Sequence, residues 1–135
     1  MAFGTGTVFT NIGKAYVVST IIANTTPPKF IAIGTGATTA ARTAANTDTA
    51  LSSEYGAPGS RTTGTASIQT VTYTGDTFQT VGTVTALGTI AVDEAGLFTS
   101  GTSNAASSLV VSATFPVINL LVNDSIQITG KITFS

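Results

Sequence analysis

Two adjacent carboxylates, Asp93 and Glu94, are the residues whose type and spacing are best suited to chemistry. They lie inside the apolar segment Thr89–Ser100 (TIAVDEAGLFTS) of a chain in which only 8% of the residues are charged. A carboxylate pair can act as general acid and base. Neighbouring residues of a strand point to opposite faces, so this pair can act together only where a bulge interrupts the strand. We therefore expect one carboxylate to face the interior of a sheet and the other to face solvent.

Glu94 is the candidate structural carboxylate. A buried carboxylate is costly unless it accepts hydrogen bonds or meets a cation. If Glu94 faces the interior, we expect it to accept backbone hydrogen bonds or to meet Arg61 or Arg42. A divalent metal needs several convergent oxygens. Apart from the pair, the chain supplies only the carboxylates of Asp48, Glu54, Asp76 and Asp124.

Most other catalytic machinery is missing from the composition. The chain has no His and no Cys, so a serine nucleophile has no imidazole base and a metal has no thiolate ligand. No Gly-x-Ser-x-Gly sequence occurs, and Gly34-Thr35-Gly36 lacks the rest of a phosphate-binding loop, which indicates a turn. The number of carboxylates does not exclude the catalytic carboxylate pair of a glycosidase. Sugar-binding sites usually add aromatic side chains, however, and the chain has no Trp. We expect no enzymatic activity, no cofactor and no metal.

The composition is that of one domain that works inside an assembly. The 135 residues are enough to bury one core, and hydrophobic content is 42%. With a net charge of −1, charge repulsion between copies is weak. A monomer solubilised by hydroxyl groups is the alternative. The basic residues are spread along the chain, which argues against a nucleic acid partner, and no apolar run approaches the ~20 residues of a membrane span.

The chain divides into an extended N-terminal arm, residues 1–10, and a single β-rich domain, residues 11–135. The arm is rich in Gly and Thr and is either a flexible terminus or a segment that lies on a neighbouring subunit. Asn11–Ala23 is expected to be a short helix capped by Asn11 or, as the alternative, by Thr10, although its β-branched residues leave a strand as a second possibility. The helix prediction rests on apolar residues at helical spacing, namely Ile12, Ala15, Val18 and Ile22.

Strands dominate the rest of the chain, because apolar and polar residues alternate between Gly, Asn and Asp turns. The alternation is clearest at the last strand. A long loop at 37–59, with one helical turn near Thr49–Ser53, and a strand end at Pro116 are also expected. The pattern predicts an antiparallel β-sandwich or a jelly-roll-like barrel. The expected strands are Lys29–Ile33, Arg61–Tyr73, Phe78–Leu87, the centre of Thr89–Ser100, Ser108–Phe115 and Ser125–Phe134.

An ordered set of short motifs resembles a family of small tailed-bacteriophage virion structural proteins. The set spans nearly the whole chain. It comprises Thr10-Asn11-Ile12-Gly13-Lys14, Pro28-Lys29-Phe30-Ile31-Ala32-Ile33-Gly34-Thr35-Gly36, Asp48-Thr49-Ala50-Leu51 with Glu54, Phe78-Gln79-Thr80-Val81-Gly82-Thr83-Val84, Glu94-Ala95-Gly96-Leu97-Phe98, Phe115-Pro116-Val117-Ile118-Asn119 and Asn123-Asp124-Ser125-Ile126-Gln127-Ile128.

The resemblance implies a capsid cement or decoration protein, or a tail-fibre-like protein, and it supplies no catalytic residues. A cement protein sits on the head surface, typically as a homotrimer, and clamps neighbouring capsomers of the major capsid protein. A tail or baseplate component, which includes a tip that binds host-surface carbohydrate, is the first alternative, and a non-viral carbohydrate-binding or other module is the second. Because the chain has no coiled-coil heptads or fibrous repeat, cement is favoured. The candidate interface residues are Phe3, Val8 and Phe9 in the arm and Arg42 and Glu54 in the long loop.

Overall fold

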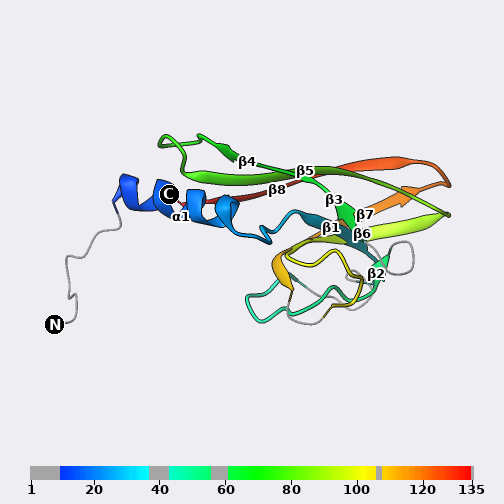
Figure 1. Ribbon diagram of the computed structural model, residues 1–135. Helices are drawn as coiled ribbons and strands as arrows, with labels where there is room; N and C mark the ends of the chain where they lie inside the picture. The colour runs from blue at the N-terminus through cyan, green and yellow to red at the C-terminus, as the bar shows by residue number, and fades with distance from the viewer. Residues whose placement is uncertain (1–9, 37–42, 56–60, 106–107, 135) are drawn as a thin grey trace.

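The computed structural model describes residues 10–36, 43–55, 61–105 and 108–134. It contains one helix and eight strands in two antiparallel sheets (Figure 1). This confirms the predicted mainly β fold, a sandwich with a short N-terminal helix. The elements are α1 (Asn11–Ala23), β1 (Phe30–Gly34), β2 (Glu54–Tyr55), β3 (Thr62–Thr63), β4 (Thr65–Gln69), β5 (Thr77–Thr85), β6 (Ile90–Phe98), β7 (Leu109–Leu120) and β8 (Ser125–Thr133).

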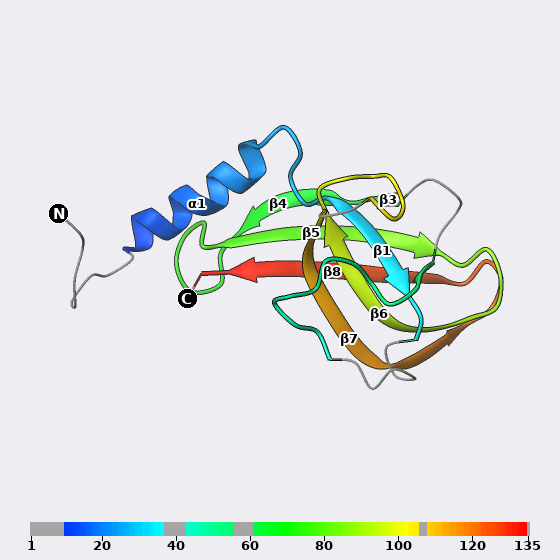
Figure 2. The ribbon, with the colours of Figure 1, turned by 90° about the horizontal axis from the view of Figure 1, so that it is seen from below.

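The two sheets pack face to face. The first, which we call sheet A, has the order β2-β1-β6-β7, and β3 also pairs with β1. The second, sheet B, has the order β4-β5-β8 (Figure 2). The core lies between them and combines Ile31, Val92 and Leu97 of sheet A with Val84 of sheet B. Along β8 the even-numbered residues are half-buried and the odd-numbered ones are exposed, so the alternation predicted for the last strand is confirmed.

Helix α1 covers the end of sheet B that extends past sheet A, where it packs against β4 and β5 (Figures 1 and 2). The backbone N–H of Gly13 donates to the Thr10 hydroxyl at 3.2 Å, which makes Thr10 the N-cap. The helix was predicted, and Thr10 is one of the two N-cap residues expected from the sequence. Val18 is fully buried, whereas Ile12, at the start of the same predicted face, is 85% exposed. Among the described residues, no helix is long and apolar enough to span a membrane.

Pro116 does not end a strand, contrary to the prediction, because β7 continues through it to Leu120. The pairs Val92↔Ile118 and Glu94↔Thr114 flank a register shift, and Pro116 lies in the unpaired stretch of β7 between them. β7 is also an edge strand of sheet A. A proline without a backbone N–H is tolerated at such a position.

Two further predictions about the strands were wrong. The single strand expected at Arg61–Tyr73 is split by Gly64, so that β3 joins sheet A and β4 joins sheet B. A Cβ at Gly64 would lie 2.8 Å from Val81 O, which explains the glycine where the chain crosses between the sheets. Residues Thr49–Ser53 do not form the expected helical turn. The strand β2 begins directly after them, at Glu54. β2 pairs only with the distant β1, which a local pattern does not reveal.

Candidate functional site

Asp93 and Glu94 lie at an irregularity of β6, and both are buried, with exposed fractions of 3% and 0%. Val92 and Ala95 on either side both belong to the core between the sheets. In a regular strand, residues three apart point to opposite faces, so the alternation fails between these two. The register shift from Val92 to Glu94 is the cause. The prediction that one carboxylate faces solvent is therefore wrong.

Glu94 is held against the segment that leads into β2. The backbone N–H of Ser53 donates to Glu94 Oε1 at 3.1 Å, and Glu94 is paired across the sheet with Gly34. A Cβ at Gly34 would lie only 2.5 Å from Glu94 Oε1. The glycine therefore provides the space for the carboxylate, which joins β1, β6 and the chain before β2. Its proposed structural role stays a prediction.

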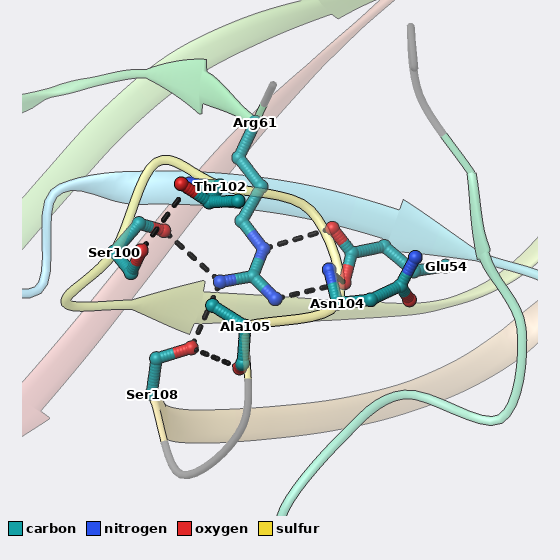
Figure 3. Close-up of polar contacts among 7 residues, drawn as sticks. All are labelled: Glu54, Arg61, Ser100, Thr102, Asn104, Ala105 and Ser108. Atoms are coloured by element: carbon teal, nitrogen blue, oxygen red, sulfur yellow. Dashed lines mark hydrogen bonds and ion pairs between the residues drawn. The ribbon is translucent and has the colours of Figure 1, made fainter. Parts of the chain in front are cut away.

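Arg61 lies at the centre of a polar cluster on the outer side of sheet A (Figure 3). Its guanidinium donates to both carboxylate oxygens of Glu54, at 2.8 and 2.9 Å. It also donates to Ser100 O at 3.0 Å and to Ser108 Oγ at 2.9 Å. The guanidinium carbon lies 3.5 Å from the centroid of the Phe98 ring, which adds a cation–π contact. The cluster joins the stretch that carries Glu54 and Arg61 to the β6–β7 connection, which carries Ser100 and Ser108.

The partner of Arg61 is thus Glu54, whereas Glu94 accepts a backbone hydrogen bond, which was the first of the alternatives expected for it. The signal that was available is weak: two opposite charges seven residues apart in a chain with few charges. The side chains of Arg61 and Glu54 are 2% and 6% exposed, so the ion pair is buried and connects two parts of the same chain. An interface role for Glu54 stays a prediction. The other four candidate interface residues, Phe3, Val8, Phe9 and Arg42, lie outside the described residues.

These carboxylates accept hydrogen bonds from other parts of the same chain. Within residues 10–36, 43–55, 61–105 and 108–134, no three His, Cys, Asp or Glu side chains are grouped so that they could hold a metal ion. No buried side-chain nitrogen or oxygen in that part of the chain lacks a hydrogen-bond partner. The buried polar groups therefore hold loops against the sheets.

Asp76 fixes the turn between β4 and β5. Its carboxylate accepts the backbone N–H groups of Val71, Thr72 and Tyr73 at 3.0, 2.8 and 2.7 Å, and the Thr77 hydroxyl at 2.9 Å. The hydrogen bond from Tyr73 contributes most, and together these bonds hold the pKa of Asp76 well below its ordinary value of 3.8, although burial acts in the opposite direction. The ionised carboxylate therefore holds the turn at neutral pH.

Two exposed apolar surfaces lie at opposite ends of sheet B. The helix-end surface consists of Ile12 and Tyr16 on α1 with Val71 and Tyr73 in the adjoining turn, which are 40% to 85% exposed. Ile12 and Tyr73 line one shallow groove of about 370 Å³ with Asn11, Ala15 and Thr74.

The hairpin-end surface consists of Leu87, Leu121 and Val122, which are 63%, 62% and 56% exposed. These residues belong to the β5–β6 and β7–β8 connections, which are joined by hydrogen bonds from Ala86 N to Asp124 O and from Asn123 N to Ala86 O. The two connections therefore present one continuous end of the molecule. Both surfaces are exposed on the described part of a single chain, and large exposed apolar side chains of this kind mark interaction sites when they are grouped.

Comparison with known proteins adds no relative from which a function could be transferred. No protein-family model matches the chain, and no match was found among curated proteins or solved structures.

Proposed function

We propose that the chain is a structural protein of a bacteriophage virion, and specifically a capsid cement protein. In this role it sits on the surface of the head as a homo-oligomer, a trimer by the resemblance of its motifs, and clamps neighbouring copies of the major capsid protein. The tail or baseplate location is the competing outcome of the experiment below.

The observation that supports this proposal is the pair of apolar surfaces at the two ends of sheet B. A clamp needs two separate contact surfaces on one rigid body. The register of β5 with β8 runs from Thr77↔Thr133 at the helix end to Thr85↔Ser125 at the hairpin end. Eight steps along an extended strand span about 26 Å, so the two surfaces are separated by at least the length of β5. Each surface is able to contact a different protein.

The exposed apolar side chains at each end are enough to give such a clamp a modest binding free energy. Full burial of a Leu or aromatic side chain contributes about 1.5–3 kcal/mol. Three or four such residues at each end give a modest affinity for one copy. Many copies on a repeating shell, linked to one another, add avidity. A net charge of −1 adds little repulsion between them.

The test combines location with binding. Particles that contain the chain are labelled with gold-conjugated antibody and reconstructed by electron microscopy. Label and density over the head are the expected result. Density on the tail alone would show that the chain is a tail or baseplate component and not a capsid cement protein. Absence of the chain from particles would overturn the virion proposal.

Binding to shells that lack the protein tests the two surfaces separately. Tyr16→Ser changes the helix-end surface and Leu121→Ser changes the hairpin-end surface. We expect each change to lower shell affinity about tenfold or more, since each removes roughly 1.5–3 kcal/mol of burial. Thr83→Ala is the control, because Thr83 is exposed on β5, the central strand of sheet B, and belongs to neither surface. Unchanged binding by both surface variants would remove these surfaces from the mechanism.

A further inference from the structure

The open edge of β8 is an unused site for strand pairing. β8 pairs with β5 over nine residues without a register shift. It is the last strand of sheet B, so its other edge has no strand partner in the described structure. An edge of this length presents a row of free backbone donors and acceptors.

The backbone groups on that edge can be assigned. The N–H of Phe134, the residue next to β8, donates to Asp76 O on the β5 side. Successive residues of a strand direct their backbone groups to opposite sides. The N–H and C=O groups of Gln127, Thr129 and Lys131 therefore point away from β5, toward the open edge. An added strand would find three regularly spaced donor and acceptor pairs.

This edge lacks the features that usually prevent strand addition. The other long edge strand, β7, contains Pro116 and two register shifts. β8 has neither a proline nor a shift, and its one charged residue is Lys131. Proline, bulges and charges are the devices that keep edge strands unpaired. Ile126, Ile128 and Ile132 are half-buried on the core side, so a further strand would cover their exposed portions.

We propose that residues 3–9 of a second copy add to this edge as an antiparallel strand. The segment is uncharged and consists of Gly, Thr, Val and Phe, so nothing in it repels Lys131. Gly and Thr leave the backbone accessible, and Phe3 and Phe9, which share one face of a strand, can offer apolar side chains to the core side. This inference rests on the proposed function, since it assigns the predicted intersubunit role of the arm to a site on the next subunit.

The direction of the chain selects a second copy as the donor. The start of α1 lies beside the β4–β5 turn, since Ala15 approaches Gly75 and Lys14 lies over the Tyr73 ring. β8 ends at this same end of sheet B, where Thr133 pairs with Thr77. A segment that leads into Thr10 along its own β8 would have to run parallel to it. Parallel pairs are slightly less stable than antiparallel pairs, and only another copy supplies the antiparallel direction.

Head-to-tail contacts of this type close into a ring when the rotation between successive copies closes. The arm of each copy reaches the next copy, so the contact is compatible with the proposed trimer.

Disulfide trapping tests the proposal cleanly, because the chain has no cysteine of its own. Two variants are purified and mixed: one carries Thr7→Cys or Val8→Cys, which sample both faces of the arm, and the other carries Thr129→Cys. Oxidation should give a covalent product of one chain of each kind. The control replaces Thr129→Cys by Thr83→Cys. Thr83 lies on β5, one strand further from the edge. The Cα atoms of the arm and of Thr83 would then be separated by two strand spacings, which exceeds the reach of a disulfide.

Cross-linking to Thr129→Cys at least several-fold above the Thr83→Cys level supports the proposal. Equal or absent cross-linking of the mixed chains overturns it. A double variant, Thr7→Cys with Thr129→Cys, that closes only within one chain also overturns it, because the arm then serves its own subunit. All three readouts use the isolated protein, so their failure is distinguishable from a failure of the virion proposal, which is tested on particles.

Discussion

The ion pair between Arg61 and Glu54 should be the most sensitive polar feature of the fold. The side chains are 2% and 6% exposed, and Arg61 donates four hydrogen bonds that end on Glu54, Ser100 and Ser108. Loss of one partner of a buried pair leaves a buried charge without compensation and costs about 3–5 kcal/mol. A domain of ordinary stability has about 5–15 kcal/mol in total. We therefore expect Glu54→Gln to remove a large fraction of the stability of the protein.

Urea unfolding followed by circular dichroism measures the effect. Glu54→Gln preserves the shape of the side chain, so the change isolates the charge. Lys131→Gln is the control, since Lys131 is exposed and such surface changes usually stay within about 0.5 kcal/mol. The double variant Glu54→Leu with Arg61→Met removes both charges, and we expect it to be more stable than Glu54→Gln, because apolar replacement of a whole buried pair is often close to neutral.

A small effect of Glu54→Gln would contradict this expectation. If Glu54→Gln lowers the free energy of unfolding by less than about 1 kcal/mol, the pair behaves like an exposed surface salt bridge. The cluster would then contribute no more than its neutral hydrogen bonds.

Two further predictions concern Gly34 and Asp76. Gly34→Ala places a Cβ 2.5 Å from Glu94 Oε1 and should lower the free energy of unfolding in urea by about 1–3 kcal/mol. Gly88→Ala is the control and should change it little, because a Cβ there meets nothing closer than 3.9 Å. Equal effects of the two variants would contradict the role assigned to Glu94. Because the folded pKa of Asp76 is lowered, its contribution to stability is complete above the ordinary value of 3.8 and is lost as pH falls through the folded pKa. Asp76→Asn should therefore be less stable than the original protein at pH 7, with a difference that shrinks below about pH 4 in urea titrations; a difference independent of pH would refute this.

The parts of the fold that follow from local pattern were predictable from the sequence. The alternation of β8 and the helix cap depend on neighbouring residues; the alternation was predicted, and the cap was narrowed to Asn11 or Thr10. The register shift beside Asp93 was not, because it depends on how β6 meets β7. The Arg61–Glu54 pair was missed for the same reason: β2 exists only through its contact with β1, and local periodicity contains no information about that contact.

The use of charge connects the fold to the proposed role. Of the six acidic residues, Asp76, Asp93 and Glu94 are buried, and the side chain of Glu54 is 6% exposed. Asp76, Glu94 and Glu54 accept hydrogen bonds that hold a turn or a loop against a sheet. Charges used in this way stabilise long irregular segments without a disulfide. The consequence is a surface with few ions, which protects an isolated chain poorly against association. That property is a liability for a free monomer, and it suits a subunit whose edge and ends are covered by neighbours.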